Sequence, residues 1–131
     1  MKKTLVVTLA SLALLAGSPA FGHGGHQANE VHTPKHGGIV VEQGTLQYEL
    51  VAKPESVSIY VEDHGKKVDT AGATAKLTLL NGNEKTEAVL SSAGENKLEA
   101  TGLFRIDIGT RAVAVITLAG KPQKSVRFAL K

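Results

Sequence analysis

The sequence contains no cysteine and no tryptophan, and its single methionine is the initiating Met1. Without cysteine the protein has no disulfide, no thiolate zinc site, no blue-copper centre and no thiol nucleophile. Without an internal methionine it has no methionine-rich copper(I) site. Any metal chemistry must therefore use imidazole, carboxylate or amide groups, or the amino terminus of the processed chain.

Enzyme signatures are missing as well. The sequence has no G-x-S-x-G elbow, no phosphate-binding G-x-x-x-x-G-K-[ST] loop, no G-x-G-x-x-G and no H-E-x-x-H. Its lysines are scattered, and aromatic residues make up only 4% of the chain, so no nucleic-acid-binding patch is expected. We expect a protein that is not an enzyme and does not bind nucleic acid.

The first 22 residues have the features of a bacterial secretory signal peptide. Two lysines precede an apolar run at residues 5–16, and a Gly-Ser-Pro sequence ends it. The run is shorter than the roughly 20 residues of a membrane span, so an uncleaved anchor is the less favoured alternative. Small residues favour cleavage before His23, with Phe21 as the alternative site. We expect export to the periplasm and no membrane span after cleavage.

Three segments follow from this interpretation. Removing the signal peptide, residues 1–22, from the 131-residue chain leaves 109 residues, a common size for one domain. Residues 23–38 contain four of the five histidines, four glycines and a proline, a composition that disfavours helix and strand. We expect this segment to be a flexible arm and residues 39–131 to form a single domain.

From Ile39 onward, apolar and polar residues alternate with the period of two that is typical of half-buried strands. Turn-forming residues separate the apolar runs, and Asn81-Gly82 suits a tight hairpin in which both central residues have positive φ. The pattern predicts strands at residues 46–52, 57–62, 75–80, 86–90, 97–100, 104–108, 112–118 and 126–130. We therefore expect an all-β fold, an immunoglobulin-like antiparallel β-sandwich of about seven strands, with a small β-barrel as the alternative.

Histidine carries the clearest chemical signal. His23, His26, His32 and His36 fall within 14 positions, and imidazole is a common ligand for zinc, copper, nickel and cobalt. The two glycines between His23 and His26 allow both rings to reach one ion. Cleavage before His23 would add an α-amine, an arrangement that favours copper(II). The alternative is a solvated tail whose histidines have no function.

The other two candidate positions lie at or within the domain. His36-Gly37-Gly38 is at the junction with the first strand, so we expect His36 to be better anchored than the arm histidines, or to be a bystander in a glycine turn. His64 follows Asp63 in a predicted turn. If Glu49 lies on a neighbouring strand, these carboxylates and imidazoles would meet at one end of the domain; the alternative for His64 is an ordinary exposed turn.

Three motifs together resemble a family. They are His36-Gly37-Gly38, then Gly44-x-x-Gln47-Tyr48-Glu49-Leu50-Val51, then Ile59-Tyr60-Val61-x-Asp63-x-Gly65-Lys66. This pattern resembles small periplasmic proteins linked to heavy-metal efflux. It is also similar to the His-Gly-Gly domain at the N-terminus of adaptor subunits of cobalt-zinc-cadmium or copper-silver efflux pumps. The resemblance covers about residues 36–80, and beyond them only the β-rich style is similar.

The resemblance implies a periplasmic metal binder or a metal-delivering accessory, with a heavy-metal efflux adaptor or pump as partner. It places the family's histidine at His36 and its acidic residues at Glu49 and Asp63. The long helical hairpin of an adaptor is not recognisable in the sequence, so we expect a free-standing binder.

We therefore predict an exchangeable divalent transition metal, copper or zinc before the others, that is lost below about pH 6, where imidazole becomes protonated. The candidate ligands are His23, His26, His32, His36, His64, Glu49 and Asp63. The alternative function is a β-sandwich interaction module of an envelope complex, without a metal.

Overall fold

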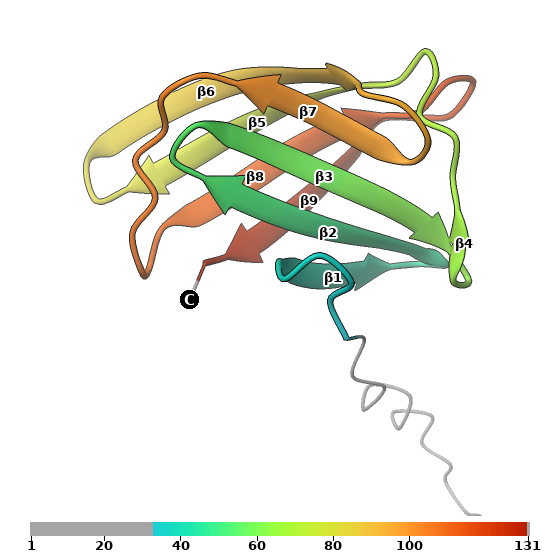
Figure 1. Ribbon diagram of the computed structural model, residues 1–131, viewed down its shortest axis with the longest axis horizontal. Helices are drawn as coiled ribbons and strands as arrows, with labels where there is room; N and C mark the ends of the chain where they lie inside the picture. Colours follow the sequence, from blue (N-terminus) through green and yellow to red (C-terminus); the bar gives the residue numbers. More distant parts are fainter. Residues whose placement is uncertain (1–32, 131) are drawn as a thin grey trace, which may run out of the picture. The chain divides into compact units, whose positions relative to one another are not determined.

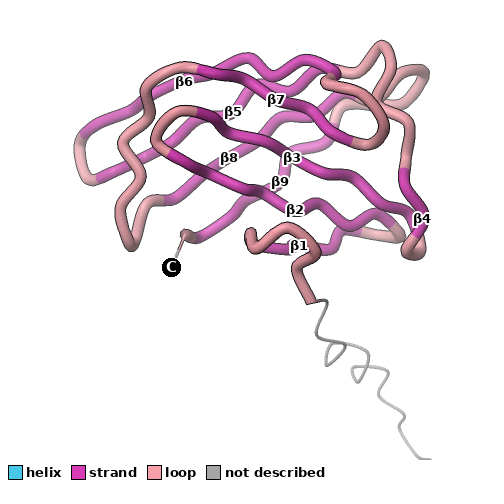
Figure 2. The backbone as a smooth tube through the Cα atoms, viewed as in Figure 1, coloured by secondary structure: helices cyan, strands magenta, loops and turns pink. Residues whose placement is uncertain are grey.

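Nine β-strands and their connections make up residues 33–130, the part of the chain that the computed structural model describes. The strands are β1 (Ile39–Gln43), β2 (Leu46–Lys53), β3 (Ser56–Asp63), β4 (Lys66–Lys67), β5 (Thr74–Asn81), β6 (Glu84–Ser92), β7 (Lys97–Thr101), β8 (Arg111–Thr117) and β9 (Lys124–Ala129). These residues include no helix (Figure 2), and so no helix that could cross a membrane. The predicted signal peptide and most of the predicted arm lie outside the described residues.

All strand pairs are antiparallel and belong to one sheet. The order is β1-β2-β3-β7-β6-β5-β8-β9, and β4 pairs with β3 outside this path. The two ends of the path approach each other: β1 contacts β9, and Gln43 Nε2 donates a hydrogen bond of 3.0 Å to the carbonyl oxygen of Ser125. The sheet is therefore nearly closed into a barrel, as Figure 1 shows. The all-β antiparallel prediction is confirmed, the sandwich is not, and the arrangement is closer to the small barrel.

The period of two in the sequence explains the core. Alternate residues of each strand point inward and form one apolar cluster, which includes Tyr48, Leu50, Val57, Ile59, Val61, Leu77, Leu90, Leu98, Ile116 and Val126, all at most 1% exposed. Each large apolar side chain buried in this way contributes about 1.5–3 kcal/mol to stability. The intervening residues, Glu49 and Tyr60 among them, belong to the outer face of the sheet.

The strand predicted at residues 104–108 does not exist. Residues 102–110 form the connection between β7 and β8, and the amides of Gly102 and Phe104 bond to carbonyl oxygens of the β2–β3 turn instead of a strand ladder. Phe104 and Ile106 nevertheless pack against the core. The alternation that predicted a strand comes from a connection in which Phe104 and Ile106 cover the core, whereas Ile108 is exposed.

The hairpin predicted at Asn81-Gly82 joins β5 and β6, with Asn81 opposite Glu84. Its central residues are Gly82 and Asn83, and only Gly82 has a positive φ, of 64°. The hairpin is therefore confirmed, but the expectation of positive φ at both central residues was wrong. A glycine at the first central position is sufficient for a turn of this kind.

Candidate functional site

Glu49 in β2 accepts an unusual number of hydrogen bonds for a side chain on the outer face of a sheet. The backbone amides of Lys35, His36 and Gly38 donate to its two carboxylate oxygens at 3.1, 2.8 and 2.9 Å. The segment before β1 covers this carboxylate, so Glu49 is only 6% exposed. Residues 35–38, which the sequence placed in the arm, are therefore fixed to β2 by a buried acid.

The ring of His36 is held by two contacts. Its Nδ1 lies 3.0 Å from Glu49 Oε1, and the ring stacks on Tyr60 with a centroid distance of 3.6 Å and an angle of 4° between the planes. Tyr60 in β3 is directly opposite Glu49 in β2, so the carboxylate and the aromatic surface come from one cross-strand pair. The sheet itself therefore sets the position and orientation of the imidazole.

The two glycines after His36 have different structural roles. Gly37 has a φ of +77° with open space around its Cα, so it supplies a backbone conformation that other residues rarely adopt. A Cβ on Gly38 would clash with the carbonyl oxygen of Leu50 and lie 2.9 Å from Val51 Cγ2. The His-Gly-Gly triplet therefore combines one turn glycine with one close approach to β2, and together they bring His36 over Glu49 and Tyr60.

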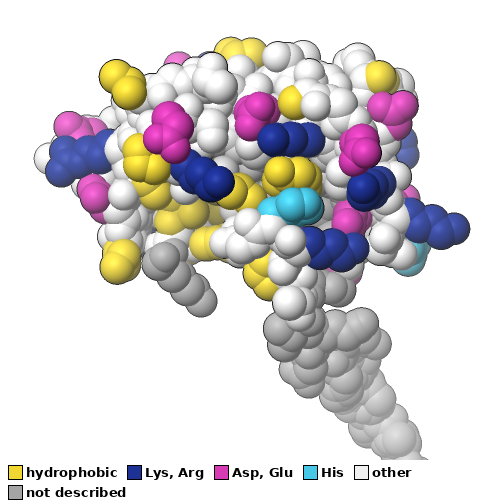
Figure 3. Space-filling view, viewed as in Figure 1, with side chains coloured by type: hydrophobic (Ala, Val, Ile, Leu, Met, Phe, Trp, Pro, Cys, Tyr) yellow, Lys and Arg dark blue, Asp and Glu magenta, His cyan; other side chains and the backbone are white. Residues whose placement is uncertain are grey.

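Charged residues surround this histidine on the same face. Lys35 Nζ forms an ion pair with Glu62 at 2.9 Å, and Lys97 Nζ lies 3.0 Å from Glu99 and 5.7 Å from the centre of the Tyr60 ring. Figure 3 shows a histidine exposed among acidic and basic side chains on the face that carries β2, β3 and β7. The side chain of His36 is 37% exposed, so the ring is anchored and still accessible.

Two opposing effects determine the pKa of Glu49. Burial raises it, and the hydrogen bonds from His36, Gly38 and Lys35 lower it; their sum is a pKa below the ordinary value of 4.5. Glu49 is therefore an anion at neutral pH. A carboxylate only accepts hydrogen bonds, so a hydrogen bond between His36 Nδ1 and Glu49 requires the proton on Nδ1; in that tautomer the second ring nitrogen, Nε2, has a free lone pair.

His64 and Asp63 lie elsewhere on the domain. His64 and Gly65 form a tight turn after β3 with φ values of +53° and +82°, and histidine is among the residues that tolerate this region. The His64 Nδ1 is 2.8 Å from Asp63 Oδ1, and its side chain is 72% exposed. His64 follows Tyr60 by four positions, a separation of about 13 Å along a strand, so the turn is remote from His36.

The structure thus divides the predicted ligands into two pairs, His36 with Glu49 and His64 with Asp63. These pairs lie in different places on the domain as well, because Glu49 is on the outer face of the sheet whereas Asp63 lines a cavity at one end of the barrel. Among residues 33–130 no group of three or more histidines and acidic residues is placed to hold one ion. His23, His26 and His32 lie outside the described residues.

Sequence reasoning gave no role to Tyr60, which stacks on the His36 ring, or to the amide of Lys35, which donates to Glu49. The alternation in β2 and β3 placed both Glu49 and Tyr60 between the apolar, inward-facing positions of their strands, but the register that makes them neighbours was not predictable. Comparisons with protein-family models, curated proteins and solved structures found no match for this chain. The resemblance to efflux-associated domains therefore stays a prediction from the motifs.

Proposed function

We propose that the protein is exported to the periplasm and there binds a divalent transition metal, with His36 as the ligand that the domain anchors. The observation that supports this most directly is the pair of contacts on the His36 ring, Glu49 at Nδ1 and Tyr60 on its face. Histidines that bind metals commonly donate their other ring nitrogen to a carboxylate, which fixes the tautomer and the orientation. Glu49 and His36 have this arrangement.

The same geometry gives Glu49 a different role from the one expected of it. Each of its oxygens already accepts two hydrogen bonds from the segment before β1, and the carboxylate is almost fully buried. A metal ion at Glu49 would have to displace these donors. We therefore assign Glu49 to the orientation of His36 and leave Nε2 of His36 as the metal ligand.

One imidazole does not hold a metal ion alone, so other ligands must complete the site. In this proposal His23, His26 and His32 of the predicted arm are further candidate ligands, with His64 as a separate and weaker position beside Asp63. Imidazole ligands without thiolate or thioether suit copper(II) or zinc. Such an assembly would exchange its metal readily, as a buffer or delivery protein for heavy-metal efflux requires.

The experiment compares His36→Gln with His64→Gln, a matched exposed histidine. The chain has two tyrosines and no tryptophan, so in a Tyr48→Phe background Tyr60 is the only tyrosine. Copper(II) bound at His36 should quench Tyr60 fluorescence saturably, because the two rings are stacked. We expect His36→Gln to weaken this quenching at least tenfold and His64→Gln to leave it unchanged. Equal copper affinity and quenching in both variants would refute the assignment of His36.

A second candidate function, a metal-free interaction module, is favoured by one observation. Leu103 and Ile108, both in the β7–β8 connection, are 92% and 88% exposed, and apolar side chains that form a contiguous exposed patch mark contact sites. This function predicts that Leu103→Ser with Ile108→Ser slows growth of the producing cell equally with and without added metal, whereas His36→Gln has no effect. The metal-binding function predicts that His36→Gln slows growth only when metal is added, and that the double variant has no effect.

A further inference from the structure

A small cavity of about 240 Å³ lies at one end of the barrel, between the β1–β2 turn, the end of β3 and the β8–β9 turn. Leu46, Ile116 and Leu118 give it an apolar lining. Its volume is below the roughly 300–1,000 Å³ of pockets for drug-sized ligands. A ligand of this cavity would therefore be a small metabolite, and barrel mouths are a common place for such sites.

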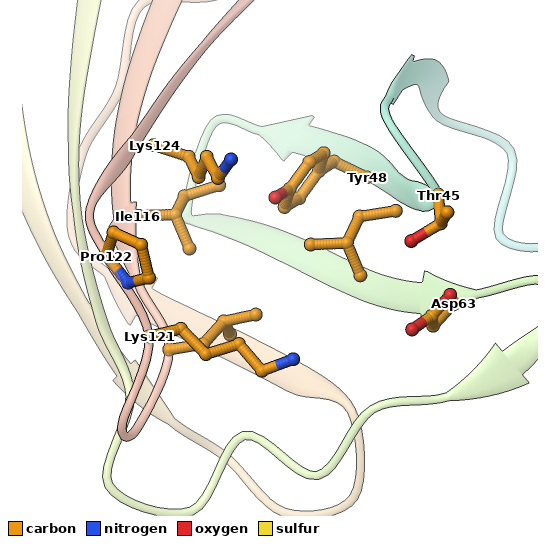
Figure 4. Close-up of a pocket in the computed structure, with 9 residues that line it drawn as sticks. Thr45, Tyr48, Asp63, Ile116, Lys121, Pro122 and Lys124 are labelled. Carbon is orange, nitrogen blue, oxygen red and sulfur yellow. The ribbon is translucent and has the colours of Figure 1, made fainter.

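Tyr48 brings a polar atom into this apolar cavity. Its side chain is 0% exposed, and its hydroxyl has no hydrogen-bond partner among the described residues. In Figure 4 the ring projects into the cavity and its hydroxyl points toward the wall with Ile116 and Lys124. Burial also raises the pKa of Tyr48, so the group stays a hydroxyl that is able to donate. Buried tyrosine hydroxyls usually have a partner, and a ligand in the cavity would supply one.

Asp63 adds a second such atom on the other side of the cavity. Its Oδ1 is buried and makes no hydrogen bond within the described part of the chain, but it lies 2.8 Å from His64 Nδ1 in an ion-pair contact, and the Asp63 side chain as a whole is 40% exposed. Figure 4 shows Thr45 beside this carboxylate. This wall therefore carries a partly exposed carboxylate, which contacts His64 but whose hydrogen-bonding capacity is not filled within the described residues.

Positive charge lies on the opposite wall. Lys121 and Lys124 flank the β8–β9 turn, and Figure 4 shows both across the cavity from Asp63. Within residues 33–130 neither lysine forms an ion pair, and Asp63 pairs only with His64. The two walls thus carry opposite charges that do not neutralise each other.

We propose that this cavity binds a small zwitterion of the amino-acid class, an inference that is independent of the metal-binding function. The ligand's ammonium group pairs with Asp63, and its carboxylate accepts from Tyr48 and from Lys121 or Lys124. Its aliphatic part packs on Ile116. A simple anion would be repelled by Asp63 and a simple amine by the lysines, so a molecule with both charges fits best.

The experiment uses L-valine with two matched probes that each lack one charge, 3-methylbutanoate and isobutylamine. Binding is followed by tyrosine fluorescence in Tyr60→Phe, where Tyr48 is the only tyrosine, and by amide NMR shifts of the unsubstituted protein. For a ligand of so few atoms we expect a Kd of roughly 0.1–1 mM for valine. Each single-charge probe should bind at least tenfold more weakly.

Two pairs of variants test the residues by NMR. Tyr48→Phe should weaken valine binding at least fivefold without lowering the Tm, whereas Tyr60→Phe should leave affinity unchanged. Asp63→Asn should remove the preference for valine over 3-methylbutanoate, and Asp69→Asn should keep it. The proposal is overturned if 10 mM valine moves no signal, if 3-methylbutanoate binds as well as valine, or if Tyr48→Phe binds like the parent protein.

Discussion

Two neighbouring residues of β2 face opposite sides of the sheet and differ in whether their polar groups have hydrogen-bond partners. Glu49, on the outer face, accepts four hydrogen bonds that fix the segment before β1. Tyr48, on the inner face, is fully buried and its hydroxyl has no partner among the described residues. The outer acid uses all its acceptors to position a histidine, whereas the inner hydroxyl is left available. The comparison shows that a buried polar group stabilises the fold when its hydrogen bonds are made, as in Glu49, and lowers the free energy of unfolding when they are not, as in Tyr48.

The largest effect is expected at the glycine that lets the chain approach Glu49. Gly38→Ala places a Cβ against the Leu50 backbone, which cannot move without breaking the β1–β2 pairing, so it should cost about 3 kcal/mol of unfolding free energy. Gly37→Ala meets no atom within 4 Å and is strained only by its φ of +77°, so it should cost about 1–2 kcal/mol. Urea unfolding measures both, and equal costs would contradict the close approach.

Removal of the Glu49 carboxylate should have the next largest effect on the free energy of unfolding. Glu49→Ala leaves three backbone amides without their acceptor, and hydrogen bonds to a charged group are worth about 1.5–3 kcal/mol. Because Lys35 and His36 are exposed, water replaces part of these hydrogen bonds, and we expect a loss of about 2 kcal/mol in urea unfolding. The copper affinity should also fall roughly tenfold or more, because the His36 ring loses its orientation. Glu99→Ala, on the same face, is the control and should leave copper binding unchanged.

The pKa of Glu49 predicts how this contribution depends on pH. Because the folded protein lowers this pKa below 4.5, the stabilisation is complete above about pH 5 and is lost as the pH falls through the folded-state value. The unfolding free energy should therefore decrease below pH 4.5, and Glu49→Gln should lose less over the same interval. Parallel pH profiles of the two proteins, from urea unfolding between pH 3 and 6, would contradict this account.

The smallest effect on the free energy of unfolding is expected for Tyr48, on the inner face of the sheet. Tyr48→Phe removes a hydroxyl that has no partner in the described structure, so unfolding free energy should stay the same or rise by up to about 1 kcal/mol. Thermal unfolding followed by circular dichroism measures this, with Tyr60→Phe as the control. A decrease of more than 1 kcal/mol would show that the hydroxyl contributes to the fold.

Most of the fold was predictable because its signal is local. The alternation along β2, β3, β5 and β8 predicted those strands, and their inward residues form the observed core. The closure of the sheet was not predictable, since it depends on the approach of β1 to β9, which are distant in sequence. The same alternation misled at residues 104–108, because a connection that packs on the core has the pattern of a strand.

The site was predictable only in part. The sequence distinguished His36 from the other histidines by its two glycines, and it selected Glu49. It did not show that Glu49 would accept hydrogen bonds from the segment before β1 and contact the His36 ring, because that depends on which donors reach the carboxylate. Tyr48 was selected only as a core residue, since no sequence pattern shows that a buried hydroxyl lacks a partner.

The central claim is that His36 binds the metal through Nε2, and that Glu49 orients the ring by its contact with Nδ1. Long-range ¹H–¹⁵N NMR of the imidazole rings during a zinc titration at pH 7.5 tests it directly. We predict that free His36 has its proton on Nδ1, and that zinc shifts the Nε2 resonance of His36 saturably while Nδ1 stays protonated. Zinc binding that leaves His36 Nε2 unshifted, or that removes the proton from Nδ1, would contradict the claim.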